Sequence, residues 1–109
     1  ETIGASAVYI GVVQEDGSGY PDCTQAFCQA FNKVAQAGTR DGTIEIRTPV
    51  IELNKASIVA LGAKLNAPLD LTWSCYAEET RACGVCDSCA LRLRAFSEAG
   101  VVDPIPYAK

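Results

Sequence analysis

The sequence predicts an α/β fold with a parallel sheet covered by helices, followed by a four-cysteine zinc-binding subdomain. Two strand-like segments are separated by a helix-forming stretch, which is the order expected of parallel strands joined by a crossover helix. Four of the six cysteines then lie close together, at positions 75, 83, 86 and 89. These two observations place a parallel sheet before a metal-binding segment.

The first predicted strand is Ala7–Val13, a continuous apolar run rich in β-branched residues. Such a run is typical of a strand that is buried on both faces of a parallel sheet. Residues 14–22 contain glycine, serine and proline and predict a loop at the carboxyl end of this strand. Open α/β sheets bind their ligands at that end of the strands.

The next predicted element is a helix that joins the two strands. Asp22 is its predicted N-cap, and Gln25 three residues later completes a capping box. Gly38 ends the helix, and 43–48 alternates as a short second strand. The apolar face of this helix consists of Phe27, Phe31 and Val34.

Two further helices are predicted in the second half. Asn54 caps the first, and the segment 66–68, Asn-Ala-Pro, stops it. An extended segment, 70–74, leads to the cysteines. Asp87 caps the last helix, which runs to Gly100. The predicted inward-facing residues are Ile58, Leu61, Gly62 and Leu65 in the first of these helices and Cys89, Leu93 and Phe96 in the second. The tail, 101–109, has two prolines and is predicted to be irregular.

The cysteine segment predicts a metal site. Three of its thiols have the spacing Cys-x-x-Cys-x-x-Cys, and four thiolates are a complete ligand set for tetrahedral Zn²⁺. Three cysteines at short spacing with a remote fourth also occur in iron–sulfur proteins, so that alternative stays open. A pair of disulfides is the third alternative, and it is disfavoured because no secretory signal is visible.

Composition excludes several classes of function. A net charge of −4 and a pI near 4.6 argue against a non-specific nucleic-acid binder. The chain has no histidine, which removes the usual general base and every mixed Cys/His zinc site. No apolar run approaches the roughly 20 residues that cross a bilayer. A reducing cytoplasm is the expected location. The first residues, from Glu1, resemble the end of a helix, so we expect a fragment of a longer protein.

Four residues outside the cysteines are candidates for binding. Tyr20 could stack on a planar ligand, and Asp22 could accept hydrogen bonds from its N–H groups. Lys55 lies at a predicted helix start, where an anion such as phosphate would explain a cation. Arg92 lies one turn before Phe96 and could face a ligand. The structural alternatives are a turn for the first two and ordinary solvated side chains for the two cations.

Two cysteines lie outside the metal-binding segment. Cys23 and Cys28 are interpreted as small buried residues that point to different faces. Cys23 follows a predicted helix cap, where a thiol could be acidified, but the chain has no histidine to act as its base.

Four motifs, in order along the chain, resemble the carboxyl-terminal half of the 7-cyano-7-deazaguanine synthase family. The resemblance runs from about Ile3 to the end of the chain. The motifs are Ser18-Gly-Tyr-Pro-Asp-Cys23, Thr72-Trp-Ser-Cys75-Tyr76, Cys83-Gly-x-Cys86-x-Ser-Cys89-x-Leu-Arg92 and Asp103-Pro-x-x-Tyr107.

The resemblance implies a Rossmann-like fold of the PP-loop ATP pyrophosphatase type. Residues 1–70 would be the carboxyl-terminal half of its nucleotide-binding domain, and 71–109 the zinc-binding subdomain and tail. It implies one Zn²⁺ on the four cysteines and a homodimer. The activity implied is an ATP-dependent ligase, with Mg²⁺, that converts 7-carboxy-7-deazaguanine and ammonia to the nitrile preQ0 on the route to queuosine. Pro49-x-x-x-Leu53-x-Lys55 resembles a phosphate-binding helix start of related PP-loop enzymes.

One motif of the family is absent from these 109 residues. The Ser-Gly-Gly-x-Asp-Ser loop, which holds the ATP phosphates, precedes this region in the family, so the chain alone is expected to be inactive. Two other functions stay open. One is a non-catalytic zinc module that binds a protein, and the other is a related PP-loop tRNA-modifying enzyme with an iron–sulfur centre.

Overall fold

The computed structural model describes residues 1–13 and 19–108 and shows an α/β protein. It consists of two compact units, Glu1–Leu53 and Asn54–Lys109. The boundary between the units therefore precedes the predicted domain boundary at residue 70. In the described part of the chain, no helix has the length and apolar character needed to span a membrane.

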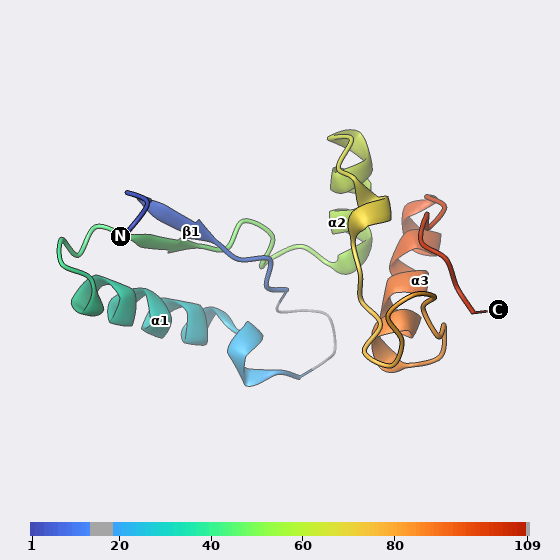
Figure 1. Cartoon of the computed structure of the whole chain (residues 1–109), viewed down its shortest axis with the longest axis horizontal. Coiled ribbons are helices and arrows are strands. Elements are labelled where there is room, and N and C mark those ends of the chain that lie inside the picture. Colours follow the sequence, from blue (N-terminus) through green and yellow to red (C-terminus); the bar gives the residue numbers. More distant parts are fainter. Residues whose placement is uncertain (14–18, 109) are drawn as a thin grey trace. The chain divides into compact units, whose positions relative to one another are not determined.

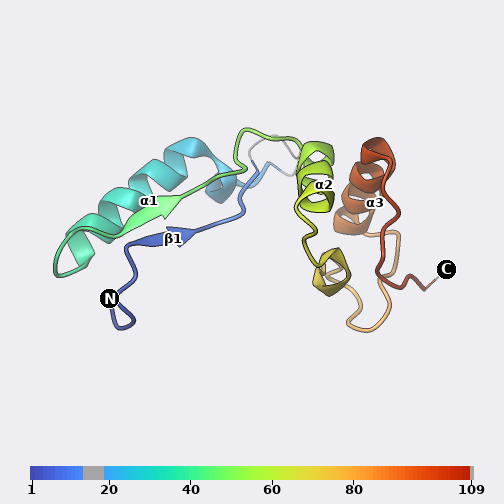
Figure 2. The same ribbon diagram turned by 90° about the horizontal axis from the view of Figure 1, so that it is seen from above.

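The first unit contains a parallel pair of strands joined by a helix. Strand β1 (Ala7–Tyr9) pairs in parallel with strand β2 (Glu45–Arg47), and helix α1 (Gln25–Gly38) connects them. Helix α1 lies alongside both strands (Figures 1 and 2). The predicted crossover and the end of its helix at Gly38 are confirmed.

The prediction that the first strand is buried on both faces is wrong for this unit. Strand β1 has three residues, and its side chains stay half-buried or exposed. Among the described residues the sheet has only these two strands, so β1 is an edge strand with no partner strand on its other side. The core is instead a small cluster of Val12, Cys28 and Ile51, with Cys23 packed against it. Of the predicted loop, 14–18 lies outside the described residues, and with it Ser18 of the first motif.

The predicted cap of the first helix is also wrong. Thr24, not Asp22, is the N-cap of α1, and its hydroxyl accepts a hydrogen bond from the Phe27 N–H at 3.2 Å. Asp22 lies in a separate 3₁₀ turn, Pro21–Cys23. Pro21 begins that turn because its fixed φ suits a first helical position.

The apolar face of α1 forms as predicted, but it is not covered within the first unit. The Phe27 and Phe31 rings stack with centroids 6.0 Å apart. Their side chains are 43% and 49% exposed, and Val34 is 63% exposed. Exposed apolar surface that is contiguous is typical of interaction sites.

The second unit is built on two packed helices. Helix α2 (Lys55–Lys64) lies beside helix α3 (Asp87–Ala99), as both ribbon views show. Val59 of α2 packs in one buried cluster with Ala95 and Phe96 of α3. Asn54 caps α2 as predicted, because its side chain accepts the Ser57 N–H at 2.8 Å.

Several local predictions in this unit need correction. Leu65 and Leu61 are exposed, and Val59 faces the core in their place. The segment predicted to be extended starts as a 3₁₀ turn, Leu69–Leu71. The N-cap of α3 is Cys86 rather than Asp87.

Helix α3 ends as predicted but buries a different face. Gly100 terminates it with φ of +68°, a conformation that suits glycine. Cys89 and Phe96 are buried, whereas Leu93 is exposed and Arg92 is buried in its place. An arginine can occupy this position because the tail supplies an acidic partner, Asp103. Residues 101–108 are irregular, as predicted, and lie along α3 in both views.

Candidate metal centre

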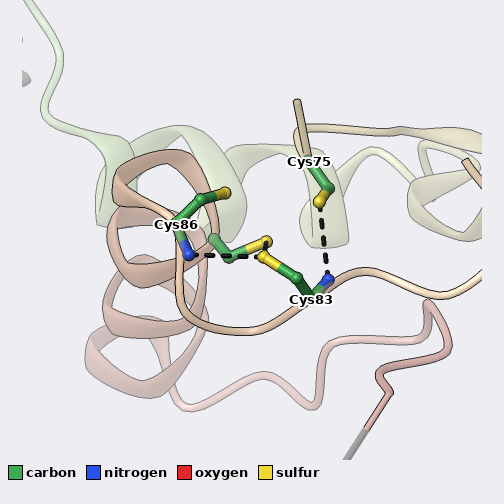
Figure 3. A group of neighbouring side chains, drawn as sticks. Cys75, Cys83 and Cys86 are labelled. Atoms are coloured by element: carbon green, nitrogen blue, oxygen red, sulfur yellow. Dashed lines mark hydrogen bonds between the residues drawn. The ribbon is translucent and has the colours of Figure 1, made fainter. Parts of the chain in front are cut away.

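Four thiols converge in the second unit. The Sγ atoms of the four predicted ligands all lie within 4.8 Å of one another. Figure 3 shows Cys75, Cys83 and Cys86 with their sulfurs turned toward one another. Cys75 comes from the extended segment, Cys83 from the loop that follows, Cys86 from the cap of α3 and Cys89 from its first turn.

Backbone amides surround the sulfurs. The N–H groups of Val85 and Cys86 donate to Cys83 Sγ at 3.5 and 3.3 Å, and the Cys83 N–H donates to Cys75 Sγ at 3.4 Å (Figure 3). Gly84 makes this tight turn possible, since its φ is +77°, which side chains other than glycine rarely adopt. Amides that point at sulfur stabilise thiolates, which are the metal-binding form of cysteine.

The surroundings of the thiols give them different pKa values. The hydrogen bond from the Cys83 backbone lowers the pKa of Cys75 to about 6, and outweighs the burial of this residue. The backbone N–H of Cys89 likewise lowers the pKa of Cys86. Burial raises the pKa of the Cys89 thiol to about 12. A bound divalent cation would supply the charge that a buried Cys89 thiolate needs.

The donor set fits one tetrahedral ion. Four ligands at roughly 2.3 Å from a Zn²⁺ ion stand about 3.8 Å apart from one another. Cys83 Sγ and Cys89 Sγ are 3.9 Å apart, and all six cysteines are free thiols. The geometry therefore favours a shared ion over the disulfide alternative.

A buried polar network adjoins the four-cysteine cluster. The Arg92 guanidinium donates from Nε and Nη2 to the two carboxylate oxygens of Asp103, at 2.7 and 2.9 Å. Its remaining N–H groups donate to Thr72 Oγ1, Ser74 Oγ and the Leu69 carbonyl. All five guanidinium N–H groups thus have acceptors within the protein, and the prediction that Arg92 binds substrate stays a prediction.

The charges in this network reinforce one another. The bond to Asp103 raises the pKa of Arg92. Burial opposes ionisation of Asp103, but the hydrogen bonds from Arg92 and Tyr107 outweigh it and hold the pKa of Asp103 below its usual range. Burial raises the pKa of Tyr107, and its hydroxyl donates to Asp103 at 2.6 Å.

The other candidate binding residues are accessible. Tyr20 and Asp22 are exposed in and beside the 3₁₀ turn that precedes α1. Cys23 Sγ lies 3.9 Å from Asp22 Oδ1. Lys55 is the first residue of α2, next to its cap Asn54, and is half-buried. Tyr20 and Asp22 belong to the first unit, and Lys55 and the cysteines to the second.

Sequence patterns did not identify three residues that hold the site together. The Trp73 indole N–H donates to the carbonyls of Cys75 and Glu78, both at 3.1 Å, and so fixes the loop around Cys75. Asp103 and Tyr107 hold Arg92 and the tail. All three lie in motifs that resemble the family, and this membership is the sequence feature that could have identified them.

Known proteins are similar to nearly the whole length of the chain. The profile of the family described as "Queuosine biosynthesis protein QueC" matches residues 1–100. A 7-cyano-7-deazaguanine synthase of Koribacter versatilis is 60% identical over 108 residues, 99% of this chain and 46% of the relative. The synthases of Acidobacterium capsulatum and Aliarcobacter butzleri are 57% and 61% identical, over 99% and 98% of this chain and 47% of each relative.

The chain thus spans about half the length of the curated relatives that it matches. The family profile covers most of the residues from both units, including all four converging cysteines. The chain therefore belongs to the QueC family of queuosine biosynthesis proteins.

Proposed function

We propose that this chain is the zinc-bearing carboxyl-terminal portion of an ATP-dependent ligase that converts 7-carboxy-7-deazaguanine and ammonia to 7-cyano-7-deazaguanine. One observation carries this proposal: relatives named for that product are 57–61% identical over nearly the whole chain. The chain spans about half of each relative, so the activity belongs to the chain together with the other half.

The steps of the proposed reaction determine what the protein must contribute. A carboxylate is a poor electrophile, so ATP first activates it and ammonia then displaces the activated oxygen to give an amide. A second activation removes the remaining oxygen and leaves the nitrile. The protein contributes mainly positioning and stabilisation of charge, which is compatible with the absence of histidine from this chain.

Accessible side chains suit the positioning roles. Tyr20 would stack on the planar deazaguanine, and Asp22 would accept hydrogen bonds from its N–H groups. Lys55 would contact the nucleotide phosphates, because a capped helix N-terminus favours anions. ATP would bind with Mg²⁺, as phosphate-transferring sites commonly require.

The metal would have a structural role. Four thiolates fill the coordination sphere of Zn²⁺ and leave no position for a catalytic water. Four sulfurs within 4.8 Å of one another favour one ion. In an iron–sulfur cluster the four thiolates are divided among two or four irons, so as a set they stand further apart than around a single ion. Metal analysis should give one zinc per chain and no visible absorbance, whereas iron with a visible band would select the iron–sulfur alternative.

The uncovered face of α1 is a docking surface for the amino-terminal half of the enzyme. Phe27, Phe31 and Val34 expose an apolar stripe there, and about half of each full-length relative lies outside the matched region. The complete enzyme would act in the cytoplasm as a homodimer.

The decisive experiment supplies the missing half. The amino-terminal half of the Koribacter versatilis relative is co-expressed with this chain, and the complex receives 7-carboxy-7-deazaguanine, ammonium, ATP and Mg²⁺. Mass spectrometry should detect the nitrile product with the complex and none with either half alone. A folded, zinc-loaded complex that forms no nitrile would contradict the proposal.

Matched variants test the assigned residues in the same assay. Asp22→Asn should raise KM for the deazaguanine, while Asp41→Asn, at an exposed site in the same unit, should not. Lys55→Met should raise KM for ATP, with Lys64→Met at the other end of α2 as its control. Equal effects of the members of either pair would remove that assignment.

A further inference from the structure

We propose that the carboxyl-terminal tail, Asp103–Ala108, positions the metal-binding cysteines, with Asp103 and Tyr107 as its positioning residues. The proposal requires that the four thiolates bind one metal ion, and it is independent of the ligase activity. It rests on the tail contacting α3 and the loop that carries Cys83 directly, and the segment before Cys75 through Arg92.

The first contact is with α3, which carries Cys89. Arg92 lies one turn after Cys89 and forms a two-bond pair with Asp103, at 2.7 and 2.9 Å. The two side chains are only 7% and 6% exposed. A buried pair with this geometry fixes both partners, because separating them would leave a buried charge without a counter-charge.

The second contact reaches the segment that precedes Cys75. The Arg92 guanidinium, held by Asp103, donates from Nη1 to Thr72 Oγ1 at 2.9 Å and to Ser74 Oγ at 3.4 Å. Asp103 thereby orients one guanidinium that joins α3 to the residues immediately before Cys75.

The third contact is with the loop that carries Cys83. The Ala82 N–H donates to the Pro106 carbonyl at 2.9 Å, and the Ala108 N–H donates to the Ala82 carbonyl at 2.9 Å. Arg81 adds two bonds to the Tyr107 carbonyl. The residue immediately before Cys83 is therefore paired with the tail like a strand.

Tyr107 joins these contacts into one network. Its hydroxyl donates to Asp103 at 2.6 Å, and its ring lies 3.5 Å from the position that a Cβ of Gly84 would take. Ile105, two residues earlier, is buried in one cluster with Cys75 and Cys89. The tail thus contacts the metal loop near Gly84 and packs against Cys75 and Cys89, without supplying a ligand itself.

Ligands that are held in place lose less conformational freedom when a metal binds, so the affinity is higher. Outer residues that orient metal ligands typically contribute 10–100-fold in affinity. We expect Asp103→Asn to weaken metal binding by about that factor, since the variant removes the charge that orients Arg92.

The test measures Co²⁺ binding to the reduced 109-residue chain from its thiolate absorbance, and Zn²⁺ binding by competition with a chelator. Asp103→Asn should weaken both, and Tyr107→Phe should weaken them to a smaller degree. Tyr76→Phe is the matched control, because that side chain is 87% exposed. Val59→Ala destabilises the same unit from a different buried cluster, that of Val59, Ala95 and Phe96. It should leave metal affinity within about twofold, since it removes none of the hydrogen bonds that Asp103 and Tyr107 form.

Two results would overturn the proposal. The first is an equal loss of affinity in Asp103→Asn and Val59→Ala, which would reduce the role of the tail to general stability. If Asp103→Asn does not fold, unchanged metal affinity in Tyr107→Phe would overturn the proposal instead.

The second result comes from hydrogen exchange after the metal is removed by chelation. The Ala82 and Ala108 amides should stay protected, and exchange as fast as that of the exposed Val102 would mean that the metal orders the tail.

Discussion

Cys89 is the residue on which the metal site depends most. It is 1% exposed, and burial, with the hydrogen bonds to the neighbouring thiols, raises the pKa of its thiol to about 12. A metal ion is therefore the natural counter-charge for a group that is otherwise costly to ionise. Its position in the first turn of α3 also makes it the ligand that connects the loop to a helix.

Replacement of Cys89 should remove the metal and loosen the second unit. We expect Cys89→Ser to lose most of the zinc and to lower the melting temperature, because structural zinc contributes directly to folding. Atomic absorption and thermal denaturation measure the two effects. Cys28→Ser is the matched control: that buried thiol lies outside the cluster, so its zinc content should stay unchanged. Full zinc content in Cys89→Ser would argue against a structural site.

The corrected cap of α1 gives a second prediction at this scale. Thr24→Ala should destabilise the chain by about 1 kcal/mol, because it removes the acceptor for a helix N–H group. Asp22→Ala should cost less than about 0.5 kcal/mol, since an exposed residue away from such features contributes little to stability. Urea denaturation compares the two variants, and the reverse order would return the cap to Asp22.

At the scale of elements, local patterns predicted ends and connections well. Gly100 ends α3 because glycine readily adopts the left-handed conformation found there, whereas α1 ends at Gly38 with an extended Thr39 as its C-cap. The parallel connection through α1 follows from the order of elements. The predicted buried faces were less accurate, because burial depends on what packs against an element. Leu93 has a helical spacing typical of a core residue, yet it is exposed, and Arg92 is buried against an aspartate from the tail.

The convergence of the cysteines was the most predictable part of the site. Their spacing and number indicate a shared ion without reference to the rest of the fold. The role of Asp103 could not be predicted in the same way, because the Arg92–Asp103 pair depends on how an irregular, proline-containing tail returns to α3. The spacing of residues within a helix does not indicate where a distant irregular segment will pack.

The apolar stripe on α1 supports a prediction at the same scale. Phe31→Asp should weaken association of this chain with the amino-terminal half by about tenfold or more, because a charge replaces apolar surface that would be buried. Gln29→Asp places the same charge on the other side of the helix and should have little effect. Co-purification or titration calorimetry measures the difference. Equal binding by both variants would show that another surface joins the halves.

At the scale of the whole chain, the division into two units predicts that metal removal acts on one of them. The four cysteines all lie in Asn54–Lys109, and the core of Glu1–Leu53 consists of its own residues. Trp73 is the single tryptophan of the chain, and its indole N–H donates to the carbonyls of Cys75 and Glu78. Its fluorescence therefore reports on the metal loop.

Chelation of the metal should change the Trp73 emission, since the loop around Cys75 would lose its anchor and the indole N–H would lose its two carbonyl acceptors. Helical circular dichroism from α1 should persist, because none of the four converging cysteines belongs to that helix. Heating the chelated chain should then show a Trp73 transition well below that of the metal-loaded chain. Loss of all helical signal together with the fluorescence change would mean that the two units fold as one, and that the metal stabilises the entire chain rather than its second unit.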